Sequence, residues 1–230
     1  MSERSPRNPP YLALLALDAE STPVLQALSR RLPAGGSVAL AVPTPEAAVA
    51  RVRETCVTLF LQGEGPTGPL GRQLIAQARA AGNAALRIGA TGPVALDDHG
   101  HLLRAPGTRL GDAVEALGQS FELGLAGLRH VEVSTLLAQP GPVTAAVGKG
   151  TPAQAVAQAL ERMGQRRLSA ARHVFLNLEQ GRSGTLPEAA ALAKTVQAAV
   201  PAGVTVEFGA PLTDAIRDGA ARVLLLVAEG

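Results

Sequence analysis

A nine-residue stretch that follows an apolar run has the residue types of a phosphate-binding loop. The run Val57–Leu61 leads into GEGPTGPLG, residues Gly63–Gly71, and a helical pattern follows. A phosphate needs backbone N–H groups that converge between a strand and a helix, and only glycine lets the main chain come close enough. The residues that make this stretch a candidate nucleotide loop are Gly63, Gly65, Thr67 and Gly68.

Other residues of the same stretch oppose phosphate binding. Pro66 and Pro69 each remove an N–H donor, and Glu64 adds a carboxylate that repels phosphate. The stretch also lacks the Gly-Lys-Ser/Thr sequence that ends a P-loop. These residues favour a structural turn between a strand and a helix over a working phosphate cradle.

The turn after the first apolar run contains no glycine. The run Tyr11–Leu17 is followed by DAEST, residues 18–22, so that carboxylates stand where a phosphate would bind. A ribose or a metal ion bound by Asp18 is an alternative, but Asp and Ser before a helix are common caps. The absence of GxGxxG at this turn also disfavours a small-molecule enzyme on a Rossmann-like sheet.

Few other residues could hold a metal ion or act as a nucleophile. Asp97, Asp98, His99 and His101 crowd together without a partner cluster of Cys, His or Glu, which is ordinary turn chemistry. We therefore expect no metal site. The single cysteine, Cys56, is expected to be a buried, inert thiol.

Apolar runs alternate with helical patterns, which is typical of an α/β fold. The strands expected in the first half are Tyr11–Leu17, Ser37–Val42, Val57–Leu61 and Ala84–Gly89, and the helices between them are Pro23–Arg31, Pro45–Arg53 and Gln73–Ala81. Right-handed crossovers then predict a Rossmann-like parallel sheet with helices on both faces. A helix over Gly111–Gly124 joins this half to a smaller α+β domain, in which we expect a strand near Val143–Val147 and a helix over Pro152–Met163.

The last third of the chain carries the pattern of a known family. Between Arg172 and Gly230 it contains VFLNLEQG, a helix, VTVEFGAP and RVLLLVAEG. This resembles the C-terminal domain of FtsZ, the bacterial tubulin relative that assembles the division ring. Upstream, GPVTAAVGKG (Gly141–Gly150) resembles the Gly-Pro…Gly-Ile-Gly segment of FtsZ, and Ala171, Arg172 and Asn177 match its Glu-Gly-Ala-Arg-Gly-Val-Leu-Val-Asn strand.

The resemblance implies a GTPase fold whose sites have changed. FtsZ has a glycine run after its first strand and Gly-Gly-Gly-Thr-Gly-Thr-Gly after its third, where this chain has DAEST and GEGPTGPLG. GLRHVEV (Gly127–Val133) resembles the catalytic loop with which FtsZ reaches the nucleotide of the next subunit. At the positions of its Asn and two Asp stand His130, Glu132 and Thr135, which favours a packing or interface role over catalysis.

The resemblance also divides the chain into parts. We expect a disordered tail at residues 1–9, a degenerate GTPase-like domain at 10–110, a central helix at 111–126 and an FtsZ C-terminal-like domain at 127–230.

Composition narrows the range of partners. Aromatic residues make up only 2% of the chain and the formal net charge is +2, so nucleic-acid binding is not indicated. The sequence has neither an apolar run of about 18 residues nor a signal peptide, and no membrane-tethering peptide follows the last expected strand. We expect a cytoplasmic protein that does not bind membranes.

Together, these observations favour a catalytically degenerate FtsZ-like protein without a cofactor. It is expected to act in cell division or the cytoskeleton through contacts with itself or with a true FtsZ, without GTP hydrolysis. The alternative is a divergent GTPase that binds GTP or GDP through Gly63–Gly71 and polymerises. The sequence leaves enzymatic activity open, and the glycine count at the two turns disfavours it.

Overall fold

The computed structural model describes eight segments of the chain, which form two compact units, Met1–Gly100 and His101–Gly230. The described segments are residues 12–32, 37–41, 44–62, 68–89, 101–104, 109–120, 135–136 and 142–229. Among the helices in these segments, none is both long enough and apolar enough to cross a membrane.

The division between the units falls after Gly100, whereas the sequence analysis placed a domain boundary after residue 110. The difference arises because β5 (His101–Arg104) pairs in parallel with β6 (Val143–Gly150) of the second unit. The central helix expected at 111–126 corresponds to α4 (Leu110–Gln119). The rest of that expected helix, from 121 onward, and the expected tail at 1–9 lie outside the described residues.

The first unit is the expected parallel sheet. Its strands are β1 (Leu12–Ala16), β2 (Ser37–Ala41), β3 (Val57–Gln62) and β4 (Ala84–Gly89). They are all parallel and lie in the order β2-β1-β3-β4. Every residue of β1 and β3 is buried, as expected for strands that are covered on both faces.

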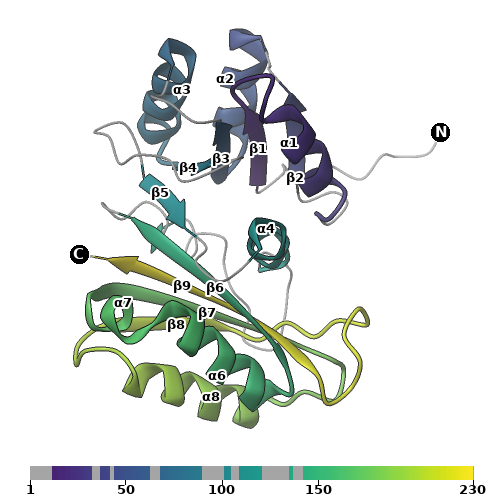
Figure 1. The fold of residues 1–230 in the computed structure, drawn as a ribbon, viewed down its shortest axis with the longest axis vertical. Coiled ribbons are helices and arrows are strands. Elements are labelled where there is room, and N and C mark those ends of the chain that lie inside the picture. Colours follow the sequence, from purple (N-terminus) through teal and green to yellow (C-terminus); the bar gives the residue numbers. More distant parts are fainter. Residues whose placement is uncertain are drawn as a thin grey trace, which may run out of the picture. The chain divides into compact units, whose positions relative to one another are not determined.

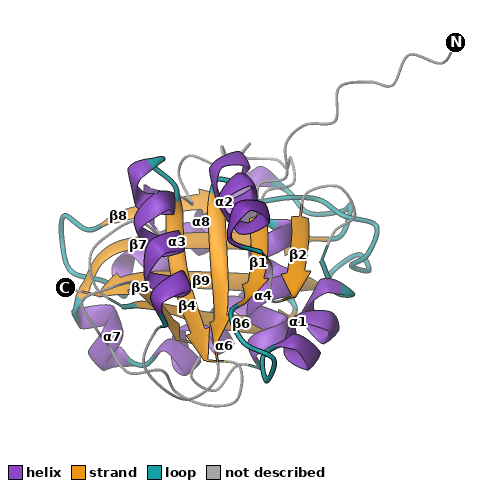
Figure 2. Ribbon diagram, turned by 90° about the horizontal axis from the view of Figure 1, so that it is seen from above, coloured by secondary structure: helices purple, strands orange, loops and turns teal. Residues whose placement is uncertain are grey.

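Three helices connect these strands: α1 (Thr22–Ser29), α2 (Pro45–Glu54) and α3 (Pro69–Ala80). Helices α2 and α3 lie side by side (Figure 2), and both contribute to one apolar core that includes Leu15 and Phe60. The connection from β1 to β2 runs in the opposite direction to the later ones, so right-handed crossovers place α1 on the other face.

Helix α3 begins earlier than the sequence analysis predicted. Its first residue is Pro69 rather than Gln73, because Gly68 forms the N-cap and Pro69 takes the first helical position. Proline suits that position, since its missing N–H would have no partner within the helix. Pro69, one of the two prolines that disfavour a phosphate-binding loop, is therefore the first residue of a helix.

The second unit combines α4 and β5 with further elements. These are β6 (Val143–Gly150), α6 (Pro152–Met163), α7 (Gln165–Ser169), β7 (Ala171–Gln180), α8 (Leu186–Ala198), β8 (Thr205–Gly209) and β9 (Ala221–Glu229). The strand order is β5-β6-β9-β7-β8. Strand β9 lies between β6 and β7 and is antiparallel to both (Figure 1), whereas β8 is parallel to β7.

The two faces of this second sheet carry different helices. Helices α6 and α8 share an apolar core with alternate residues of β9, namely Val223, Leu225 and Val227. Because side chains alternate along a strand, Arg222 and Leu224 belong to the opposite face. Helix α4 lies on that face (Figure 1), where it contacts β6 and β9.

A glycine allows α6 to pack directly against β6. A Cβ atom added at Gly148 would lie 1.9 Å from the backbone oxygen of Ala155. Strand β6 was expected to end near Val147, but it continues through Gly148 to Gly150 because β9 pairs with it along its whole length. The start of α6 is fixed by a capping box between Thr151 and Gln154.

Replacing Gly148 with Ala is expected to destabilise the second unit by about 3 kcal/mol, because α6 would have to move away from β6. Gly203→Ala is a matched control: its φ is +87° but a Cβ there meets nothing within 4 Å, so only backbone strain of about 1 kcal/mol is expected. Urea unfolding followed by circular dichroism measures both. Equal losses in the two variants would contradict the packing argument.

Candidate functional site

The turn after β1 is closed by its own carboxylate. Asp18 Oδ1 accepts a hydrogen bond from the backbone N–H of Ser21 at 2.8 Å and another from the Ser21 hydroxyl at 2.7 Å. Ser21 is fully buried. A negative group of the chain therefore takes donors beside the N-terminus of α1 that an incoming phosphate would need.

The start of α3 is the described part of the candidate nucleotide loop. Gly68 is its N-cap and has no side chain that could accept the first N–H groups of the helix. A Cβ at Gly68 would meet nothing within 4 Å, so the glycine is not required for packing. The other three candidates, Gly63, Gly65 and Thr67, lie outside the described residues.

The positions predicted from the FtsZ catalytic loop are described only at their end. Thr135 is exposed and lies beside the buried Leu136 in a short helical segment. His130 and Glu132 lie outside the described residues. Their expected packing or interface role therefore stays a prediction.

Two further predictions concern metal ions and the single thiol. Asp97, Asp98 and His99 lie outside the described residues, so the absence of a metal site also stays a prediction. Cys56 is half-buried rather than fully buried. Burial raises the pKa of its thiol, which leaves less of the reactive thiolate at neutral pH than in a free cysteine.

Three charged residues form a row across the second sheet. Lys149 on β6 lies opposite Arg222 on β9, and Arg222 lies opposite Glu179 on β7. Residues that are paired across strands project from the same face, which here is the face covered by α4. Like charges at directly opposed positions, such as Lys149 and Arg222, are unfavourable unless anions lie nearby.

Helix α4 supplies two of these anions, and β7 supplies the third. Asp112 Oδ1 lies 3.3 Å from Lys149 Nζ, and Glu115, one turn later, forms an ion pair with Arg222. Glu179 Oε2 accepts hydrogen bonds from Arg222 Nε at 2.7 Å and from Nη2 at 2.5 Å. Only 11% of the Arg222 side chain and 2% of the Glu179 side chain are exposed. Arg222, Glu179 and Glu115 therefore form a largely buried ion cluster.

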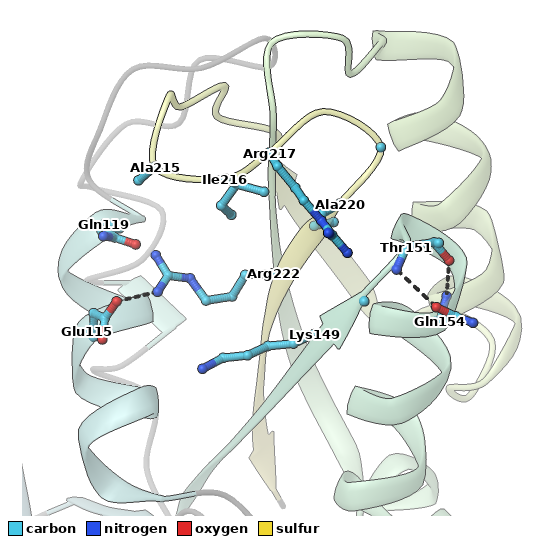
Figure 3. A pocket seen from close by; sticks show the side chains of 13 residues that line it. Glu115, Gln119, Lys149, Thr151, Gln154, Ala215, Ile216, Arg217, Ala220 and Arg222 are labelled. Atoms are coloured by element: carbon cyan, nitrogen blue, oxygen red, sulfur yellow. Dashed lines mark hydrogen bonds and ion pairs between the residues drawn. The ribbon is translucent and has the colours of Figure 1, made fainter.

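A cavity of about 420 Å³ opens beside the ion cluster (Figure 3). Its described walls are α4, the end of β6, the start of α6 and the segment 215–222, and the described lining residues belong to the second unit. Its charged lining residues are Glu115, Lys149, Arg217 and Arg222. A neighbouring cavity of about 270 Å³ shares Thr151, Gly219 and Ala220 with it.

Gly68 and Thr135, the predicted site residues that the structure describes, do not line the larger cavity. Its charged residues lie far apart in the chain: Arg222 and Glu115 are separated by 107 positions. The register of β9 against β6 and β7 brings them together, and no local motif marks that register. The feature of the sequence that could have indicated this site is Lys149, a charged residue between two glycines at the end of an apolar run.

Comparisons with known proteins identify the fold of the chain but not its activity or its partners. No family model matches the sequence, and no curated protein matches it. Solved structures of FtsZ and CetZ are among those that are similar along nearly all of the chain. A mutant of FtsZ from M. jannaschii has a TM-score of 0.70 at 14% identity, with 96% of this chain and 91% of that chain covered.

An empty FtsZ dimer from M. jannaschii gives the same TM-score of 0.70 and 14% identity, with 96% of this chain and 88% of that chain covered. The GDP-bound monomer of CetZ1 from Haloferax volcanii gives 0.60 and 13%, with 96% and 94% covered. The chain therefore has the two-domain FtsZ/tubulin-like fold, and the resemblance seen in the sequence is confirmed at the level of fold.

Replacing Arg222 with Met is expected to destabilise the second unit, because Glu115 and Glu179 would lose their shared cation. Removal of one partner from a buried pair costs about 3–5 kcal/mol. Urea unfolding measures the loss. Arg182→Met is the control, since its ion pair with Asp214 is exposed, and we expect its unfolding midpoint not to move. A midpoint unchanged in the Arg222 variant would contradict the role of the cluster.

Proposed function

We propose that this FtsZ-fold chain acts in the cytoplasm through protein–protein contacts, in cell division or the cytoskeleton, and does not hydrolyse GTP. It associates with itself, with a true FtsZ, or with both. It needs no nucleotide as a cofactor.

The observation that carries the proposal is the Asp18–Ser21 turn. The resemblance to FtsZ places a phosphate loop after the first strand, where close backbone approach requires glycine. In this chain the same turn is closed by hydrogen bonds of 2.8 and 2.7 Å to a carboxylate. A bound phosphate would meet the negative charge of Asp18 and would compete with it for the N–H of Ser21.

Self-association draws support from the fold. One of the similar structures is an empty FtsZ dimer. A chain with the same fold can present comparable surfaces to a copy of itself without a bound nucleotide. Since likeness at 14% identity concerns the fold alone, we propose only that the partner is a protein with an FtsZ-like fold.

The alternative function, nucleotide binding through Gly63–Gly71, rests on a different observation. The first N–H groups of α3 have no side-chain cap, and Gly68 leaves open space beside them. The similar CetZ1 structure binds GDP. These features favour residual phosphate binding at α3, although Pro69 removes one donor from that turn.

Titration of the protein with GTP and with GDP in the presence of Mg²⁺ tests the first half of the proposal. We expect no binding heat at micromolar ligand and no release of inorganic phosphate. If GTP does bind, Gly68→Asp distinguishes the alternative, because a carboxylate at this N-cap would take the donors of α3 and abolish binding. Micromolar binding accompanied by turnover would disprove the proposal.

Sedimentation velocity tests the second half. We expect association that grows with protein concentration and is the same with and without GTP, or a complex with added FtsZ. A chain that stays monomeric at every concentration and does not bind FtsZ would contradict a role in protein–protein contacts.

A further inference from the structure

We propose that the cavity beside Arg222 binds a small phosphate ester that carries hydroxyl groups, such as a sugar phosphate. The described residues that line this cavity belong to the second unit, whereas the candidate nucleotide loop belongs to the first. This inference therefore goes beyond the proposed function and does not depend on it.

The cavity has the size and the walls of a small-molecule site. Its volume of about 420 Å³ falls within the range of roughly 300–1,000 Å³ that such sites occupy. Apolar lining residues of the cavity include Ala215, Ile216 and Ala220. A ligand with a compact carbon skeleton can pack against these side chains.

The charged side chains favour an anion. Lys149, Arg217 and Arg222 line the cavity, and Glu115 is the one carboxylate among the described lining residues. Glu115 is already paired with Arg222. Among the residues that the structure describes, no carboxylate forms an ion pair with Arg217, which is exposed.

Arg217 and Lys149 approach the cavity from different elements. Arg217 extends from the segment before β9 toward Thr151, while Lys149 and Arg222 extend toward α4 (Figure 3). Lys149 has a single carboxylate contact, with Asp112 at 3.3 Å, and its side chain is 54% exposed. A phosphate beside Arg217 would balance the charge of this guanidinium group, which can bind it with two parallel hydrogen bonds.

A hydroxyl group on the ligand is indicated by Gln119. Its Oε1 atom is buried at the cavity wall and has no hydrogen-bond partner in the described part of the chain. A buried acceptor without a donor is unfavourable, so a rotation of the Gln119 amide that lets a ligand hydroxyl donate to this oxygen would gain affinity. Inorganic phosphate bound at the cations would not reach Gln119, so this acceptor would stay without a donor.

The N-terminus of α6 contributes little to this site. The N–H of Gln154 is bonded to Thr151 Oγ1 at 3.4 Å, and the N–H of Thr151 is bonded to Gln154 Oε1 at 3.1 Å. Pro152 has no N–H at all. Affinity must come from the cationic side chains and from Gln119, which makes single substitutions informative.

Calorimetric titration of the full chain at low salt, with glucose 6-phosphate, inorganic phosphate and glucose as separate probes, tests the proposal. We expect saturable binding of glucose 6-phosphate, weaker binding of phosphate and none of glucose. Arg217→Ala and Lys149→Ala should each weaken glucose 6-phosphate binding by about tenfold, as expected for the loss of a charged hydrogen bond. Gln119→Leu should weaken glucose 6-phosphate binding but leave phosphate binding unchanged.

Arg182→Ala is the matched control, because Arg182 is an exposed arginine of the same unit that does not line the cavity. Circular dichroism verifies that each variant is folded. Absence of saturable glucose 6-phosphate binding would overturn the proposal. So would an equal loss in the Arg182 and Arg217 variants, since that result would indicate non-specific attraction of anions.

Discussion

Arg222 lies on β9, between β6 and β7, on the sheet face that α4 covers. Carboxylates on β7 and on α4 balance its charge. Its cross-strand neighbours are a cation, Lys149, and an anion, Glu179, and α4 adds Glu115. Taking an arginine out of water costs several kcal/mol unless carboxylates surround it. The position of α4 over β6 and β9 is therefore constrained by charge as well as by apolar packing. The cavity lies where this helix and the segment before β9 leave the end of the sheet uncovered.

The turn after β1 and the start of α3 differ in their local chemistry. The turn after β1 carries an internal anion at Asp18, whereas the start of α3 keeps a glycine and open space. The first arrangement puts a carboxylate beside the N-terminus of α1, whereas the second leaves the first N–H groups of α3 without a side-chain cap. Function in a fold of this kind depends on such local chemistry rather than on the arrangement of strands.

Sequence reasoning succeeded where local rules decide the structure. The apolar runs of β1 and β3 predicted buried parallel strands, and α6 begins at Pro152 as predicted. It failed where pairing between distant segments decides. The strand was expected near Val143–Val147, although pairing with β9 extends β6 to Gly150. The ion cluster and the cavity depend on the register of three strands, and that register leaves no local trace in the sequence.

The central place of β9 has a consequence for the synthesis of this protein. Residues 221–229 emerge from the ribosome after β6 and β7, yet they form the only link between those two strands within the described sheet. Until they emerge, β6 and β7 each expose an unpaired edge that can bind another chain. The second unit therefore closes late, through contacts distant in sequence, and during translation a nascent copy offers two open edges to chaperones or to its neighbours on a polysome.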